Sequence, residues 1–461
     1  MVFSSTIFLF CFLPLFLAVY YLTPLRWRSP VILVFSYLFY GWWKLEFLGL
    51  LVGVTAVSYV IGKYLSASAD PARRRLLLSV GIVLNLAALV YFKYANFGMQ
   101  ALNDLLGMLH LSAIPFAEII LPIGLSFYIF HAISYLVDLY RKDAEPSRNF
   151  VDFASFIALF PHLVAGPVLR FRLLADQFRS RTHSLQLFGQ GCLLFMGGFC
   201  AKVLVADPIA PVADAAFALN APSVADAWLG TVAYTLQLFF DFSGYSTMAI
   251  GLALMIGFRF PQNFNDPYWS RSITEFWQRW HMSLSGWIRD YVYIPLGGNR
   301  KGPIRTYINL GLAMLICGLW HGANWTFIVW GAWHGGVLLI ERFLSHRFGP
   351  SRFPVAIKWA WTLFLVMLGW VVFRAESMHA AVRMFRGMFG GNGFGLTAPM
   401  AWHVSTDRLL MMGVGVVLVL ALPWLKTDKA RWTKALLIPL FVVAVATLAS
   451  QKFTPFLYFQ F

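Results

Sequence analysis

The stretch that decides the fold runs from Ser272 to Arg300 and reads SITEFWQRWHMSLSGWIRDYVYIPLGGNR. An apolar run separates it from GLWHGANW at Gly318–Trp325 and WGAWHG at Trp330–Gly335. Three of the chain's ten histidines lie here among arginines and tryptophans: His281, His321 and His334. Titratable groups are costly to bury in an apolar chain, so this cluster predicts a functional site rather than packing. We expect His281 and His321 to face each other across a reaction chamber inside the membrane.

The composition around this stretch predicts an all-α, polytopic membrane protein. The 461 residues are 59% hydrophobic and 12% charged, and the mean hydropathy is +0.68. A soluble chain carries about a quarter charged residues. Apolar runs of about 20 residues recur throughout, and each can cross a hydrocarbon layer roughly 30 Å thick. We expect about a dozen membrane segments in a single domain, residues 1–461.

The net charge of +16 does not predict nucleic-acid binding. Lys and Arg collect in short loops, as the positive-inside rule requires, and no basic run is combined with soluble-domain patterning. The four cysteines lie in apolar segments without C-x-x-C spacing: Cys11, Cys192, Cys200 and Cys317. Neither a metal site nor a disulfide framework is therefore predicted.

The positions of the basic residues predict the topology. If the loops at Arg26/Arg28 and Arg73–Arg75 are cytoplasmic, the N-terminus is periplasmic. The connection Asn96–Glu118 has no Lys or Arg and is expected to be an outside loop. Phe150–Leu169 contains Pro and Gly breakers and has basic flanks, which predicts a re-entrant segment.

The apolar runs on either side of His321 each look short for a full span. They cover about Tyr307–Leu319 and Trp325–Ile340. Two such halves would meet at H-G-A-N, so we expect His321 at membrane depth, near the tip of a hairpin.

A capping box, Ser272-x-x-Glu275, predicts the start of an amphipathic helix at the cytoplasmic interface. On a continuous helix one face would carry Trp277, His281, Leu284 and Ile288. The alternative is an interfacial anchor with an incidental histidine.

His321 lies between Trp320 and Gly322, with Asn324 about one turn further on. A low-dielectric environment keeps an imidazole neutral, so His321 could accept a proton from a hydroxyl or thiol, as acyl transfer requires. The alternative is a hydrogen-bonded core histidine. His334 would lie on nearly the opposite face of a continuous helix and is expected to be structural. Asp241 either pairs helices or lines the chamber, and we favour the structural role.

No G-x-S-x-G elbow, P-loop or H-E-x-x-H motif is present. Longer motifs resemble the membrane-bound O-acyltransferase family, with the strongest likeness to the membrane subunit of bacterial alginate O-acetylation. The motifs include WQRWHMSLS and GLWHGAN, and also Tyr91–Phe97, Leu121–Phe127, Phe160–Pro167, Asp241–Ser246 and Tyr293–Arg300.

This resemblance implies a ring of tilted and re-entrant helices around a central tunnel. It implies that His321 is the family's invariant histidine and His281 its second one. It further implies that acetyl from a cytoplasmic donor, acetyl-CoA, crosses the bacterial inner membrane, where an SGNH-type periplasmic partner transfers it to a polysaccharide, with alginate favoured over cellulose or peptidoglycan. No bound cofactor is expected.

Several further residues are candidates for donor or substrate contacts. Arginine forks suit phosphates, so the phosphates of coenzyme A or lipid headgroups are expected at Arg279, Arg289 and Arg300. The remaining candidates are Trp277, Trp320, Asn324 and Asp241. The alternative from another class is a transporter without chemistry, although the inverted repeats typical of transporters are not evident in the sequence.

Overall fold

The computed structural model describes residues 1–425, 431–450 and 456–457, and within them every regular element is helical. Seven helical stretches among these residues are long and apolar enough to cross a membrane: Leu45–Ala67, Pro71–Met108, Leu185–Ala218, Val224–Met255, Pro303–His321, Trp325–Phe348 and Val355–Arg374. Two shorter apolar helices are Phe8–Leu22 and Ala435–Ser450. The all-α membrane fold is thus confirmed, whereas the count of about a dozen segments is not.

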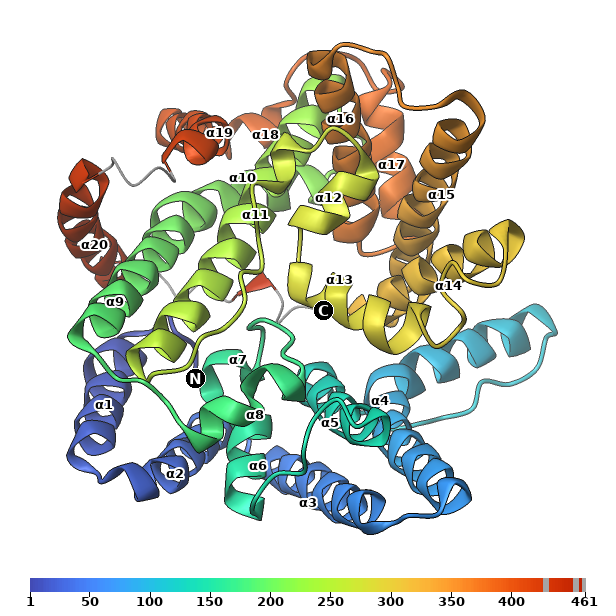
Figure 1. Cartoon of the computed structure of the whole chain (residues 1–461). Coiled ribbons are helices and arrows are strands. Elements are labelled where there is room, and N and C mark those ends of the chain that lie inside the picture. Colours follow the sequence, from blue (N-terminus) through green and yellow to red (C-terminus); the bar gives the residue numbers. More distant parts are fainter. Residues whose placement is uncertain (426–430, 451–455, 458–461) are drawn as a thin grey trace. The chain divides into compact units, whose positions relative to one another are not determined.

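The helices form two compact units, residues 1–192 with 249–260, and residues 193–248 with 261–461. Figure 1 gives their order along the chain. The single domain, the ring and the tunnel stay predictions.

In the first unit, α5 (Leu125–Arg141) packs against α3 (Leu45–Ala67) and α4 (Pro71–Met108). Arg74 holds one end of these helices together, because its guanidinium donates to the carbonyls of Leu65, Leu139 and Tyr140 at 2.7–3.0 Å. Those carbonyls belong to the last turns of α3 and α5, where the i+4 backbone N–H of a continuing helix is missing. One arginine thereby caps two helices.

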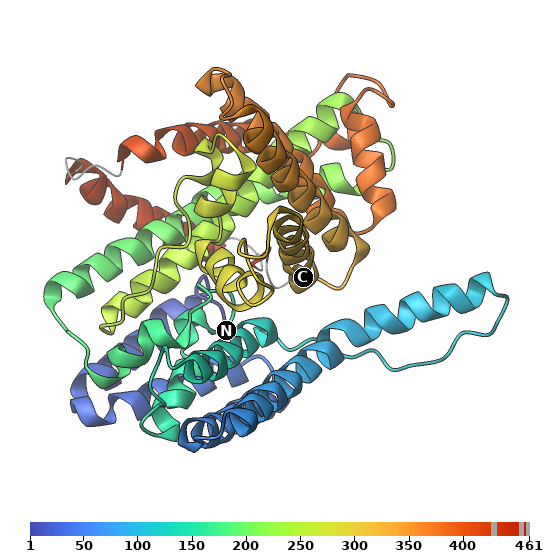
Figure 2. The ribbon, with the colours of Figure 1, turned by 45° about the vertical axis from the view of Figure 1, so that its right-hand side comes forward.

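Helix α4 is 38 residues long, or about 57 Å at 1.5 Å per residue, and therefore exceeds the hydrocarbon thickness. Figure 2 shows it continuing past α3 and α5 before an extended segment returns along it. Asn96 holds this segment with two hydrogen bonds to the backbone of Ile119, and Asn103 does the same with Ile114. The predicted start of the loop at Asn96 is therefore wrong. The helix continues to Met108, because no proline interrupts it.

The broken segment after α5 contains α6 (Phe150–Ala158), α7 (Phe160–Leu163) and α8 (Phe171–Arg179). Asn149 caps α6 by accepting a hydrogen bond from the backbone of Asp152. The chain leaves helical geometry at Leu159 and again after Val164. The interruption predicted from Pro161, Gly166 and Pro167 is present, and the sidedness of this segment stays a prediction.

In the second unit, α14 (Pro303–His321) and α15 (Trp325–Phe348) form a closely packed hairpin, with α16 (Val355–Arg374) against α15. The crossing is close because it is built on glycine: a Cβ added at Gly331 would lie 2.6 Å from the carbonyl oxygen of Met314. The hairpin at H-G-A-N is confirmed, but its arms are not half-spans. They have 19 and 24 residues, because the helices continue through polar residues at both ends.

The remaining elements of this unit include α10 (Asp207–Ala218), α11 (Val224–Met255, whose last seven residues belong to the first unit) and α17 (Met378–Met388). α9 (Leu185–Cys200), half of which belongs to this unit, is followed by a π-helical segment, Ala201–Ala206. The other helices are α1 (Leu13–Leu22) and α2 (Arg28–Gly41) in the first unit, and α12 (Ile273–Arg279), α13 (Met282–Ile288), α18 (Ala398–Ala401), α19 (Thr406–Leu425) and α20 (Arg431–Ser450) in the second.

Candidate active site

His281 lies at a break between α12 and α13. Ser272 caps α12 by accepting a hydrogen bond from the backbone N–H of Glu275, as the capping box predicts. The continuous helix that we expected is wrong, because Trp280 is extended and His281 adopts a left-handed conformation with φ 44°. A left-handed backbone at a residue other than glycine is strained, and such strain concentrates at functional sites.

Asn263 fixes the imidazole of His281. The Oδ1 atom of Asn263 accepts from the backbone N–H of Ser283 at 3.1 Å and from its hydroxyl at 2.8 Å. Because a backbone N–H can only donate, this contact identifies Oδ1 as the acceptor. The Nδ1 atom of His281 lies 3.2 Å from the same oxygen, so Nδ1 carries the proton in the neutral ring. Nε2 therefore presents a lone pair.

Two buried polar atoms at this position have no hydrogen-bond partner among the described residues. They are Nε2 of His281, an acceptor, and Nδ2 of Asn263, a donor. His281 is fully buried, and burial lowers its pKa to about 3, which keeps the ring neutral. Buried polar atoms normally find partners. An unmet acceptor beside an unmet donor suits a substrate that carries a hydroxyl or thiol and a carbonyl.

The indole of Trp320 brings the two predicted histidines together. The ring centroid of Trp320 lies 6.1 Å from that of His281 and 4.8 Å from that of His321. His321 ends α14 and is 7% exposed. Its ring also meets Trp330 and Phe373 edge-on, at 5.0 and 5.2 Å. The structure thus places both imidazoles in one buried aromatic cluster.

His334 belongs to the same cluster. Its ring centroid lies 5.1 Å from that of Trp330 and 5.3 Å from that of Trp277. A continuous helix would separate His334 from His321, but the chain turns at Gly322–Asn324. Neither ring nitrogen of His334 has a hydrogen-bond partner among the described residues. His334 thus packs among the aromatic residues around His321, and Trp330 contacts both imidazole rings.

Asp241 is part of a buried ion network. The Nζ atom of Lys202 lies 2.8 Å from carboxylate oxygens of both Asp207 and Asp241, and Asp241 also accepts from the backbone N–H of Leu457 at 3.0 Å. These contacts occupy the carboxylate, as a structural role predicts. The next residue, Phe242, meets His281 edge-on at 4.8 Å, so the network anchors the helix that forms one wall of the His281 site.

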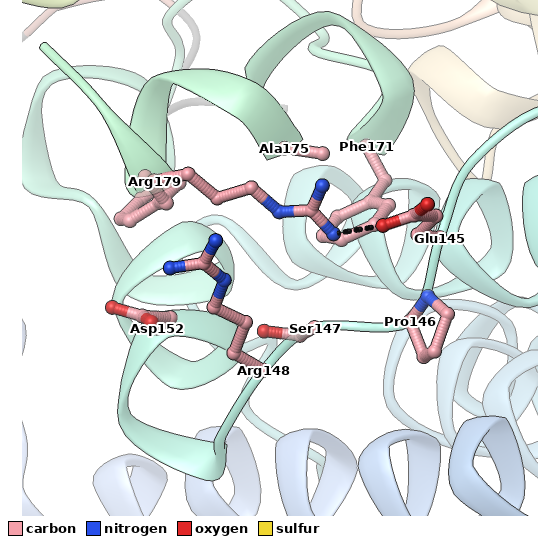
Figure 3. Close-up of a pocket in the computed structure, with 9 residues that line it drawn as sticks. Glu145, Pro146, Ser147, Arg148, Asp152, Phe171, Ala175 and Arg179 are labelled. Atoms are coloured by element: carbon pink, nitrogen blue, oxygen red, sulfur yellow. Dashed lines mark hydrogen bonds and ion pairs between the residues drawn. The ribbon is translucent and has the colours of Figure 1, made fainter.

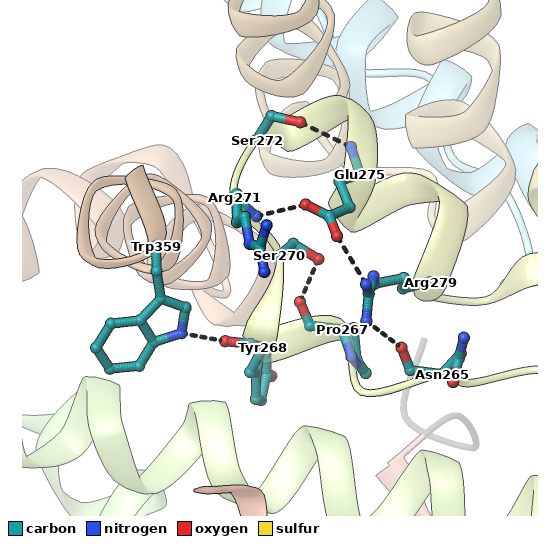
Figure 4. Close-up of polar contacts among 9 residues, drawn as sticks. All are labelled: Asn265, Pro267, Tyr268, Ser270, Arg271, Ser272, Glu275, Arg279 and Trp359. Atoms are coloured by element: carbon teal, nitrogen blue, oxygen red, sulfur yellow. Dashed lines mark hydrogen bonds and ion pairs between the residues drawn. The ribbon is translucent and has the colours of Figure 1, made fainter. Parts of the chain in front are cut away.

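The other candidates differ in how far they are engaged. Figure 4 shows Arg279 between Glu275 and Asn265: it forms an ion pair with Glu275 at 2.7 Å and donates to the carbonyl of Asn265. Asn324 caps α15 with its Oδ1 atom, which accepts from the backbone of Thr326, and its Nδ2 atom donates to the carbonyl of Glu376. Both polar atoms of its side-chain amide are therefore engaged within the protein. Arg289 is 61% exposed beside Asp290.

Arg300 is exposed in the turn before α14. Trp277 packs between Trp330 and His334. Sequence reasoning missed Asn263 and Lys202. The polar run Gln262–Asp266 was the available signal for the first, and a lysine within an apolar segment was the signal for the second.

Comparison with known proteins identifies the class. The model of the MBOAT, membrane-bound O-acyltransferase, family matches residues 75–379, and this chain belongs to that family. It is therefore a multi-pass membrane acyltransferase.

Over its full length it is 52% identical to a Pseudomonas putida protein named "probable alginate O-acetylase" and 49% identical to one of that name from Azotobacter vinelandii, covering all of each relative. A Helicobacter pylori peptidoglycan O-acetyltransferase is 34% identical over 86% of this chain and 81% of its own length.

Proposed function

We propose that this acyltransferase takes acetyl from cytoplasmic acetyl-CoA and passes it across the bacterial inner membrane for O-acetylation of alginate. An SGNH-type periplasmic partner would complete the transfer to the polymer. The full-length likeness to relatives named for alginate O-acetylation supports this acceptor. The observation that carries the chemistry is the pair of buried imidazoles that both contact the Trp320 indole.

The two histidines take different roles in this proposal. His321 is the general base or proton shuttle, which accepts the proton of the attacking hydroxyl or thiol as the acyl group moves. His281 orients the reacting group, because its Nε2 lone pair can accept a hydrogen bond while Asn263 holds the ring. A neutral ring is required for both tasks. Arg279 is paired with Glu275 and Arg289 with Asp290, at 2.7 and 2.8 Å. Arg289 and Arg300 are exposed, so these two arginines are proposed to meet the donor phosphates.

The deciding experiment measures polymer O-acetylation in cells that carry His321→Ala, matched to wild type for protein in the membrane. Removal of a general base costs about 10²–10⁴-fold. Loss of acetylation at equal protein level supports the proposal. Near-normal acetylation would contradict the role proposed for His321 and would direct attention to His281 or to the periplasmic partner for the chemistry.

The acceptor is tested separately. Acetyl content is measured on alginate and on peptidoglycan from a deletion strain with and without the wild-type gene. We expect the gene to restore acetyl on alginate. If the gene restored acetyl on peptidoglycan alone, the proposed acceptor would change from alginate to peptidoglycan, the polymer named for the Helicobacter pylori relative. The assignment as an acyltransferase would stand.

A further inference from the structure

The first unit contains a cavity of about 620 Å³ at its basic end. The described residues that line it come from the 3-10 helix Leu25–Trp27, the start of α2, the start of α6, the end of α8 and the loop between α8 and α9. Its volume lies within the range of about 300–1,000 Å³ typical of small-ligand sites. Every lining residue belongs to the first unit, so this cavity is separate from the histidine site.

The lining is strongly basic. Three arginines, Arg26, Arg179 and Arg181, line the cavity together with one acidic residue, Asp152. Arg179 is already paired, at 2.6 Å from Glu145. Asp152 is also engaged, because its Oδ2 accepts from Asn149 at 2.9 Å. Neither Arg26 nor Arg181 forms a close ion pair with another described residue, although the Asp152 carboxylate attracts Arg181 electrostatically. The lining still carries a net positive charge, because three arginines face one carboxylate.

Arg181 provides a second, independent observation. Its Nη1 atom is buried and has no hydrogen-bond partner in the part of the chain that the structure describes. The guanidinium lies over the ring of Phe258, 4.6 Å from its centroid, and burial lowers its pKa. Arg181 as a whole is half-buried. A buried N–H without a hydrogen-bond partner is costly, and an anion in the cavity would offset part of that cost through its charge.

A smaller cavity adjoins the first and shares Asp152, Phe178 and Arg179 with it. Figure 3 shows Arg148 and Arg179 among the residues that line this smaller cavity, with the dashed contact from Arg179 to Glu145. The smaller cavity, about 10 Å³, has room for no more than a water molecule. The anion is therefore expected in the larger cavity, where Arg179 is also part of the lining. Arginine forks match phosphate oxygens through paired hydrogen bonds.

We propose that this cavity binds the phosphate group of an amphiphilic ligand. The chemistry fits an anionic phospholipid headgroup or a free organic phosphate, and the apolar walls formed by Trp27 and Phe178 would contact the rest of the molecule. The ion pair Arg172–Asp143 places two further charged residues at the same end of this unit. The positive-inside rule predicts that this end faces the cytoplasm. The proposal does not depend on the acceptor or on the acyl chemistry.

The test uses the purified full-length chain and two probes. Retained phosphatidylglycerol is measured by native mass spectrometry after purification from phosphatidylcholine nanodiscs containing it, and ADP binding is measured by titration calorimetry. We expect Arg26→Gln and Arg181→Gln each to weaken binding of one probe about ten-fold or more, the loss of one charge-assisted contact. Arg75→Gln is the matched control, because Arg75 is exposed at the same basic end and lines neither cavity.

Selective loss of phosphatidylglycerol in the cavity variants supports a lipid site, and selective loss of ADP supports a free-phosphate site. Unchanged binding of both probes in both variants would overturn the proposal, as would an equal loss in Arg75→Gln. Arg26 is exposed, so its replacement leaves the fold intact and keeps the test decisive if Arg181→Gln fails to fold.

Discussion

Replacing Asn263 with alanine tests how His281 is held. The substitution removes one oxygen that accepts from three donors: Nδ1 of His281, the backbone N–H of Ser283 and the Ser283 hydroxyl. All three belong to buried residues. The imidazole would then be free to rotate or to adopt the other tautomer, in which Nε2 carries the proton and cannot accept one.

The magnitude follows from these contacts. A buried donor that loses its partner costs about 1–3 kcal/mol. One of the three can be rescued, because the Ser283 hydroxyl lies 3.5 Å from Nδ1 of His281 and could turn toward it. Two unmet donors remain, so we expect Asn263→Ala to lose about 2–6 kcal/mol of stability. We expect acetyl transfer to fall about 10²-fold, the lower end of what a positioned acid–base group contributes.

The assay is polymer O-acetylation per amount of protein in the membrane, with the thermal unfolding midpoint measured on purified protein. Ser283→Ala is the graded control, because it removes one donor and leaves the backbone N–H contact in place. Its activity should lie between those of wild type and Asn263→Ala. Acetylation of Asn263→Ala within about two-fold of wild type at equal protein level would refute the role assigned to Asn263, since a positioned acid–base group contributes far more.

Three further predictions concern pH, the ion network and the hairpin. The folded-state pKa of His281 is about 3 and that of an unfolded histidine about 6.5, so between these values only the unfolded chain binds the proton. The stability of wild type relative to His281→Gln should therefore fall by about 1.4 kcal/mol per pH unit toward pH 3. A difference in unfolding midpoint that does not change with pH would contradict this. Lys202→Met leaves the carboxylates of Asp207 and Asp241 without their cation and should lower the stability measured by unfolding in detergent by about 3–5 kcal/mol, with partial recovery when Asp241→Asn is added. Unchanged stability of Lys202→Met would show that the Lys202–Asp241 ion pair is not formed. Gly331→Leu should separate α14 from α15, because a Cβ at this position would lie 2.6 Å from the carbonyl oxygen of Met314. We expect reduced acetylation and a lower unfolding midpoint, and a fully active Gly331→Leu protein would contradict the close crossing of the two helices.

The sequence predicted those parts of the site that depend on neighbouring residues. The capping box at Ser272 and the hairpin at His321 each depend on a few consecutive residues, and the structure contains both. The predicted helix through His281 failed for a specific reason. A periodic apolar pattern indicates which side chains face inward, and it does not show that one residue has a left-handed backbone.

By itself the sequence determined the membrane class, the all-helical architecture and the family, because apolar length and long motifs are properties of the chain alone. Only the tertiary structure decided which partners the buried polar groups have. Asn263 meets His281 across 18 residues, and Lys202 meets Asp241 across 39. Burial makes such pairings obligatory, since an unpaired polar group in an apolar interior is costly. The choice of partner depends on how the helices pack, which local pattern does not contain.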